Sequence, residues 1–340
     1  MFSYEISSHI VEEDHIISTS SAVNKNMEHS INMDRFSYLK LIEENSYTIY
    51  NYMQYINPKD SELLESRLVD MCAWMYRLVD SYDLCRDIVA RAMSYLDRFL
   101  VAMLARQNKN GELSNPSFAI ESSLLQLASM TALNIAIKLT SPLKWNTNHM
   151  IRCSRGKFTL NQIISMEHQM LHVLAWRLNP PTSSEFIMLV TSLVFEVAGR
   201  PELANFFSDV GDMATFFTEL SVWDSFFLEH MPSTVAIASI LNSTESLDNN
   251  LPVGNISLTS LFINALQSLD ILPCKEALHL AQSRLHEDYL RSEDNQDSSE
   301  ESPIQIPSND RAYSPTSVVQ DMRGNHNNID KPLLQDCNGY

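Results

Sequence analysis

The amino-acid sequence predicts an all-helical protein, and three observations support this fold class. Glycine makes up only 7 of the 340 residues, about 2% against a usual share of about 7%, which argues against glycine-rich phosphate loops and tight hairpins. Apolar residues recur at helical spacing through the middle of the chain, and no stretch alternates convincingly with the period of a strand. Two helical series of about 100 residues each follow one another, separated by Pro180-Pro181.

Helical spacing predicts four helices in the first series and five in the second. They cover residues 66–79, 87–104, 123–139 and 163–176, and then 184–198, 201–221, 232–241, 258–269 and 274–290. In the first of these helices, Met71, Trp74 and Leu78 fall at i, i+3 and i+7, on one face. Thr159 and Gln162 have the spacing of a capping box and predict the start of the fourth helix.

Both ends of the chain are polar and acidic. Lys and Arg number 24 against 42 Asp and Glu, a net charge of −18. Residues 1–60 hold 9 acids and 4 bases and residues 293–340 hold 9 and 3, so these flanks carry −5 and −6, or −11 of the total. Low hydrophobicity without periodicity predicts a disordered N-terminal arm over residues 1–31 and a disordered tail over residues 292–340.

The same charge balance excludes two classes of partner. A protein that binds nucleic-acid phosphates needs positive charge, and an anionic membrane surface repels an acidic chain. No apolar run approaches the roughly 20 residues that a membrane span requires. We therefore expect neither nucleic acid nor membrane as a partner.

No catalytic motif stands out in the sequence. The chain lacks GxSxG, HExxH, a P-loop and the HRD and DFG motifs of kinases. The five cysteines are odd in number and contain no CxxC, so we expect reduced thiols. His168 and His172 share a helix face beside Glu167, but a third metal ligand is not evident, and we interpret both as helix histidines. We expect no catalytic residue, no metal and no other cofactor.

A series of motifs resembles the cyclin family. Residues 94–100, Ser-Tyr-Leu-Asp-Arg-Phe-Leu, resemble the second helix of a cyclin box. Other matching segments follow in the family's order, namely residues 34–39, 74–78, 82–84, 131–138, 166–168, 171–174, 181–182, 219–224 and 232–233. The resemblance covers about residues 33–290. Several spaced motifs in one order make it specific.

The resemblance implies two tandem five-helix cyclin folds. The first would comprise an N-terminal helix and the cyclin box over residues 32–180, and the second would cover residues 181–291. The arm, residues 1–31, and the PEST-like tail, residues 292–340, would flank them as disordered acidic segments.

The resemblance also implies a binding module rather than an enzyme. A cyclin is a regulatory subunit that binds and activates a cyclin-dependent Ser/Thr protein kinase, and we expect a role in cell-cycle control, in the nucleus and cytoplasm. Kinase substrates or inhibitors are further partners to consider. A transcription-linked cyclin and an all-helical scaffold without a kinase partner remain as alternatives, since fold does not fix function.

Four residues carry specific expectations from the resemblance. Lys138 and Glu167 match the family's Lys and Glu, which hydrogen-bond to backbone groups near the kinase αC helix. Asp97 matches an Asp with a structural role that pairs with an Arg of the first box helix. Arg67 lies one position early for that Arg, and we expect it to reach Asp97.

Met71 and Trp74 lie where cyclins dock Arg-x-Leu substrate motifs, so they form a possible docking patch. However, Arg77 stands where an acidic residue usually attracts the substrate arginine, and like charges disfavour such a contact. The alternative is that Trp74 only packs.

In the tail, Ser302-Pro303 and Ser314-Pro315 fit proline-directed phosphorylation, which adds roughly two negative charges each. The alternative is a tail that only keeps the protein solvated.

Overall fold

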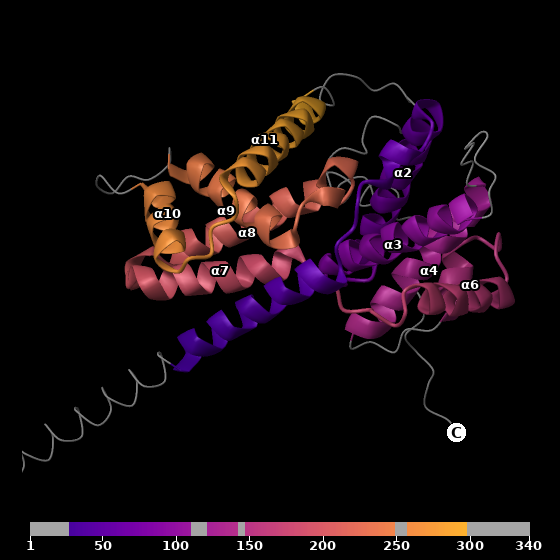
Figure 1. The fold of residues 1–340 in the computed structure, drawn as a ribbon, viewed down its shortest axis with the longest axis horizontal. Coiled ribbons are helices and arrows are strands. Elements are labelled where there is room, and N and C mark those ends of the chain that lie inside the picture. Colours follow the sequence, from indigo (N-terminus) through magenta and orange to yellow (C-terminus); the bar gives the residue numbers. More distant parts are fainter. Residues whose placement is uncertain (1–26, 110–120, 142–146, 249–256, 298–340) are drawn as a thin grey trace, which may run out of the picture. The chain divides into compact units, whose positions relative to one another are not determined.

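The computed structural model describes residues 27–109, 121–141, 147–248 and 257–297. Within these ranges the chain is helical and contains no strand, so the predicted all-helical fold class is confirmed (Figure 1). None of the described helices is both long enough and apolar enough to cross a membrane.

An N-terminal helix is described over residues 27–46. The elements that follow are η1 (Tyr52–Tyr55), α2 (Pro58–Ser81), α3 (Asp87–Lys109), α4 (Ser122–Thr140), α5 (Thr147–Cys153), α6 (Leu160–Val173), α7 (Ser183–Ala198), η2 (Pro201–Leu203), α8 (Ala204–Ser221), η3 (Ser225–Glu229), α9 (Pro232–Asp248), α10 (Leu258–Ser268) and α11 (Lys275–Asp297). The described helices form two compact units. Unit 1 comprises residues 27–48, 179–218 and 229–285, and unit 2 comprises residues 49–178, 219–228 and 286–297.

Unit 2 is built around α4, which packs against α2, α3, α5 and α6. Residues 128–137 of α4 are all buried. Ala128, Ala132 and Ala136 recur every four residues, and their small side chains let neighbouring helices approach closely. The hydroxyls of Ser129 and Thr131 donate to backbone carbonyls one turn earlier, so burial leaves neither without a partner.

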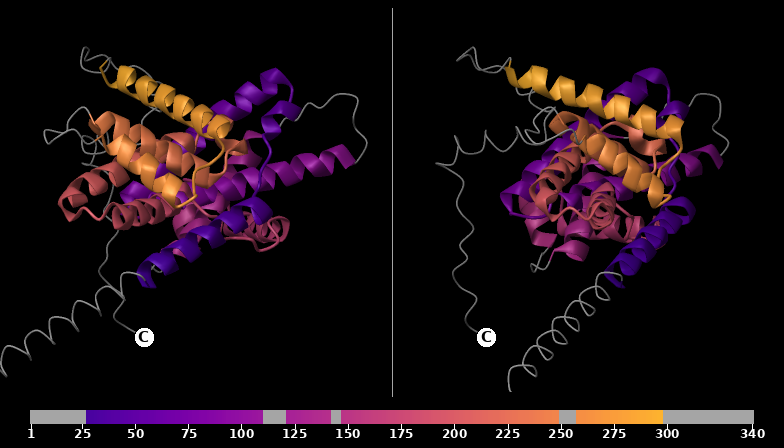
Figure 2. Two further views of the ribbon diagram at one scale, coloured as in Figure 1. Left: turned by 60° about the vertical axis from the view of Figure 1, so that its left-hand side comes forward. Right: turned by 90° about the vertical axis from the view of Figure 1, so that its left-hand side faces the viewer.

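Unit 1 is built around α9, whose residues 233–244 are all buried, and which packs against α7 and α10. The N-terminal helix runs beside α7 (Figures 1 and 2). Phe36 of this helix packs edge-on against Phe186 of α7, with ring centroids 5.5 Å apart. At its other end, His29 Nδ1 lies 2.8 Å from Glu196 Oε2.

Glu43 of the N-terminal helix caps the start of α9. Its carboxylate is 1% exposed and accepts two hydrogen bonds from Ser233, from the backbone N–H (3.0 Å) and from the hydroxyl. Burial raises the pKa of Glu43, and the Ser233 hydrogen bonds oppose that shift. The first N–H groups of a helix have no partner within the helix and carry partial positive charge. A buried carboxylate at this point therefore ties the N-terminal helix to α9.

Several helix boundaries differ from the sequence prediction. The expected arm ended at residue 31, whereas the N-terminal helix includes residues 27–31, and α11 continues to Asp297 inside the expected tail. The prediction missed α5, a seven-residue helix whose single buried residue is Met150. The predicted capping box of Thr159 and Gln162 is confirmed at the start of α6. The domain boundaries at residues 180 and 291 remain predictions.

We predict that Glu43→Ala lowers the free energy of unfolding by about 1–3 kcal/mol, because it leaves two buried Ser233 donors without an acceptor. Glu44→Ala is the matched control, since Glu44 is 49% exposed and its carboxylate lies 3.6 Å from the Lys40 ammonium, and it should change stability by less than about 0.5 kcal/mol. Urea denaturation followed by circular dichroism measures both variants. If the two substitutions lowered the free energy of unfolding equally, this would contradict the capping of α9 by Glu43.

Candidate functional site

Lys138 and Glu167 form an ion pair on unit 2. Lys138 lies in the last turn of α4, and Glu167 lies in α6. Lys138 Nζ donates to both carboxylate oxygens of Glu167, at 2.8 Å each. The Asn134 amide, one turn earlier on α4, donates to Glu167 Oε2 at 3.3 Å. The sequence singled out both charged residues but did not indicate that they pair with each other.

The pair is partly exposed, which leaves it hydrogen-bonding capacity. The Lys138 side chain is 32% exposed and that of Glu167 is 20% exposed. An ammonium carries three donors, and each carboxylate oxygen accepts more than one hydrogen bond. The pair thus presents a donor and an acceptor side by side, an arrangement that suits the N–H and C=O groups of another polypeptide.

Exposed apolar side chains lie next to these charges in the helices. Leu139 follows Lys138 and is 55% exposed, and Ile164, one turn before Glu167, is 47% exposed. Trp176 is 67% exposed and follows the end of α6. α6 stops at Val173, short of the predicted residue 176, because Ala175 (φ 49°) and Trp176 (φ 59°) adopt the left-handed conformation. Exposure, not sequence pattern, identifies these three apolar residues.

Asp97 is buried in α3, at 8% exposure, and its partner is Tyr52 of η1. The Tyr52 hydroxyl donates to Asp97 Oδ1 at 2.9 Å. Burial raises the pKa of Asp97 to about 7, while the Tyr52 hydrogen bond and the charge of Arg98 act in the opposite direction. The expected contact between Arg67 of α2 and this carboxylate remains a prediction, and the sequence analysis did not anticipate the hydrogen bond from Tyr52.

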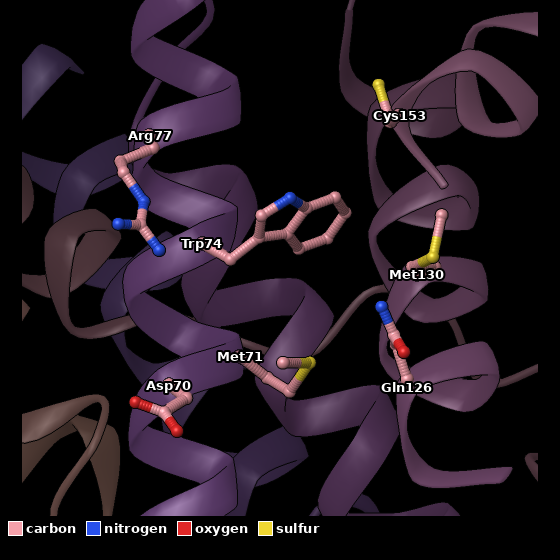
Figure 3. A pocket seen from close by; sticks show the side chains of 7 residues that line it. All are labelled: Asp70, Met71, Trp74, Arg77, Gln126, Met130 and Cys153. Atoms are coloured by element: carbon pink, nitrogen blue, oxygen red, sulfur yellow. The ribbon is translucent and has the colours of Figure 1, made fainter. Parts of the chain in front are cut away.

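Met71 and Trp74 line a groove between α2 and α4, hereafter the α2/α4 groove, with a volume of about 240 Å³. The groove is lined by Asp70, Met71, Trp74, Arg77, Gln126, Met130 and Cys153. Figure 3 shows Met71 and Trp74 extending from α2 toward Met130 and Gln126 of α4. The structure thus brings the two residues of the predicted patch together, and docking at this patch remains a prediction.

Arg86 forms a polar cluster that the sequence analysis missed. Its Nη1 donates to both carboxylate oxygens of Asp80 (2.7 and 2.6 Å), and its Nε donates to Glu219 (2.8 Å). The guanidinium also lies 4.5 Å from the centre of the Tyr76 ring. These contacts fix residues 219–228 to the helices of unit 2. No local sequence signal points to them, because Arg86 and Glu219 are 133 residues apart.

The remaining residues that the sequence singled out are the two tail serines and two histidines of α6. Ser302 and Ser314 lie outside the described residues. His168 and His172 are exposed on α6, with ring centroids 6.2 Å apart. Within the described ranges, no group of three or more His, Cys, Asp or Glu residues is placed to hold a metal ion.

The geometry can be compared with known proteins. Residues 34–179 match the model of the family described as "Cyclin, N-terminal domain". The chain is 26% identical over 205 residues to a putative cyclin-A3-1 of Arabidopsis thaliana, covering 60% of this chain and 51% of the relative. It is 24% identical over 248 residues to the G2/mitotic-specific cyclin-A of Hydra viridissima, covering 73% and 52%. The chain therefore spans about half the length of these curated relatives.

A viral cyclin structure from herpesvirus saimiri aligns with 72% of this chain and 96% of its own, at 14% identity and a TM-score of 0.48, a likeness too low to add to the assignment. The family match covers the helices that hold Lys138 and Glu167. Unit 2 thus contains the body of a cyclin box. Residues 34–179 thus form a cyclin N-terminal domain, and the resemblance of the sequence motifs to the cyclin family is confirmed.

We predict that the free energy of unfolding of Asp97→Asn rises relative to that of the natural chain as pH increases from 5 to 8. The Asp97 pKa is about 7 in the folded protein against 3.8 ordinarily, so its stabilising contribution is complete below pH 4 and is lost as pH rises through 7. Asn imitates the neutral acid and does not titrate. Between pH 5 and pH 8, the free energy of unfolding of Asp97→Asn should rise by about 2–4 kcal/mol relative to that of the natural chain.

Urea denaturation at several pH values measures this difference. Asp70→Asn, a change at an exposed aspartate, is the control and should show a flat difference over the same range. A difference for Asp97→Asn that does not change with pH would show that the carboxylate stays ionised when folded.

Proposed function

We propose that this protein is a regulatory subunit that binds and activates a cyclin-dependent Ser/Thr protein kinase. The observation that carries the proposal is the partly exposed Lys138–Glu167 pair, held in a cyclin N-terminal domain at the two positions that match the family's kinase-contacting residues. Leu139 and Trp176 add exposed apolar surface near these positions in the chain. Such a surface, with a central polar anchor and aromatic side chains, is typical of protein–protein interfaces.

Activation follows from differential binding. A protein kinase is active when its αC helix moves inward and completes a Lys–Glu ion pair in the kinase. A rigid helical block that binds only the inward arrangement shifts the kinase toward it by the difference in binding energy. The burial of α4 and the anchoring of Glu167 by Asn134 supply the rigidity this requires. The cyclin itself needs no catalytic residue.

We further propose a role in cell-cycle control, in the nucleus and cytoplasm. The support is that curated relatives of the chain are A-type cyclins, one of them named as specific to G2 and mitosis. The alternatives are a transcription-linked cyclin and a helical scaffold without a kinase partner. The proposal includes no nucleic acid or membrane as partner.

Mixing the purified chain with individual cyclin-dependent kinases tests the main proposal. We expect at least one cell-cycle kinase to bind it and to phosphorylate a generic Ser/Thr-Pro substrate at least tenfold faster than the kinase alone. Activation confined to transcription-associated kinases would favour that alternative. If the chain bound no member of a full panel of cyclin-dependent kinases, only the alternative of a helical scaffold without a kinase partner would remain.

We predict that Lys138→Ala with Glu167→Ala weakens kinase binding by about 30-fold or more, because charge-assisted hydrogen bonds in a buried interface are lost. The charge-exchanged variant, Lys138→Glu with Glu167→Lys, separates binding from stability. It retains an ion pair within the protein but loses the acceptor of the Asn134 amide, so its free energy of unfolding should fall by no more than about 1–3 kcal/mol, yet it should not restore kinase binding. Affinity is measured by surface plasmon resonance.

Arg291→Ala with Glu287→Ala is the control: it removes an exposed ion pair on α11 (3.6 Å) together with the 2.9 Å ion pair between Arg291 and the buried Asp288. This variant should bind the kinase normally. Recovery of kinase affinity by the charge-exchanged variant would show that Lys138 and Glu167 act only on the structure of unit 2.

A further inference from the structure

The α2/α4 groove combines apolar side chains with the polar side chains of Asp70, Arg77 and Gln126. Met71 and Trp74 are only partly buried, and Met130 of α4 lies across from them (Figure 3). A partly open groove of about 240 Å³ lined by Trp and Met has room for one or two aliphatic side chains. Met side chains adapt to different apolar partners, which suits a site for a peptide.

The charge at the rim of this groove is mainly positive, although the chain carries −18 overall. Arg77 lines the groove, the Lys157 ammonium donates to the lining residue Gln126, and Arg152 precedes the lining residue Cys153 in the sequence. All three cations are exposed, and neither Arg77 nor Arg152 forms an ion pair with any described residue. Asp70 is the one carboxylate among the lining residues.

The sequence strengthens this asymmetry on the α4 side of the groove, whereas α2 itself holds five Asp or Glu and three Lys or Arg. Residues 122–166 contain five Lys or Arg and no Asp or Glu. Arg77 would repel an incoming arginine, as the sequence analysis noted. The groove therefore suits a segment with apolar side chains and negative charge, not a basic one.

One segment of the chain has this chemistry. Residues 292–310 contain six acids and no Lys or Arg, and five of these acids precede Ile304 and Ile306. In an extended backbone, residues i and i+2 point to the same side, so both isoleucines can face the groove. Pro303 and Pro307 flank them and favour extended backbone. The N-terminal arm also has three acids, residues 12–14, near apolar residues, but it lacks flanking prolines.

We infer that residues 297–307 of the tail dock in the α2/α4 groove of the same molecule. Ile304 and Ile306 occupy the groove beside Met71 and Trp74, and the acidic residues before them face Arg77, Arg152 and Lys157. The tail thereby covers the surface that the sequence analysis offered to substrates. Phosphorylation of Ser302 would add negative charge beside the same cations and strengthen docking. The inference does not require a kinase partner.

Disulfide trapping in the full-length chain tests the docking. Ile304→Cys is combined with Cys337→Ser and oxidised with glutathione disulfide at pH 8.5, and the disulfides are mapped by mass spectrometry. Cys153 lines the groove and is partly buried, whereas Cys85 and Cys274 are exposed. Burial also raises the pKa of Cys153. A freely moving tail would therefore react faster with Cys85 and Cys274.

We expect disulfides from position 304 to Cys153 to exceed those to Cys85 and Cys274 together by at least fivefold. Arg77→Glu, or 500 mM NaCl, should reduce this excess at least threefold, because the contacts are between opposite charges. Val318→Cys in the same tail is the matched control and should show no preference for Cys153. Ile16→Cys probes the N-terminal arm in the same way.

Any of four results would overturn the inference: a preference for Cys85 or Cys274, an equal preference from position 318, a stronger one from position 16, or a disulfide that links two chains on a non-reducing gel. The last would assign the groove to the tail of a second copy. Because no kinase is present, failure here is independent of the kinase-binding experiments above.

Discussion

The burial of α4 on every side is the constraint on which unit 2 depends. A helix surrounded by four others must carry mostly apolar or small side chains all round, and α4 does so from Ala128 to Ile137 except at Asn134, whose buried amide donates to Glu167. The first charged residue after this stretch is Lys138, at the point where α4 leaves the core. The position of the ammonium is therefore set by packing, and Glu167 and Asn134 fix it further. Core packing and these hydrogen bonds together hold the site rigid.

Helical periodicity was sufficient to predict the fold class and the long helices, because each has one face or all faces buried against a core. It failed for α5, since a seven-residue helix with one buried residue has no detectable period. It also failed at the end of α6, where the left-handed Ala175 and Trp176 stop the helix without a glycine or proline. Local pattern cannot reveal such a stop, which depends on the conformation of the following turn.

The candidate site was predictable as a set of residues but not as a set of contacts. Motif spacing identified Lys138, Glu167 and Asp97, yet their partners lie 29 and 45 residues away along the chain. Tyr52 donates to the buried Asp97, a partner that motif spacing did not indicate, and a neutral hydroxyl is a group that can be buried at low cost once it is hydrogen-bonded. The α2/α4 groove likewise depends on residues from α2, α4 and α5 that only the fold brings together.

The cap that Glu43 forms on α9 has a consequence for the order in which the protein assembles. Glu43 and Ser233 are 190 residues apart, so at ordinary ribosomal speeds roughly 10 to 40 s separate their synthesis. Throughout that interval Phe36 and Leu39 have no completed core to enter. Contacts this distant in sequence slow folding because the chain must close a long loop before gaining their energy. The helix over residues 27–46, the first of the described helices to be synthesised, is thus among the last to find its place, and nascent chains expose its apolar face to chaperones in the meantime.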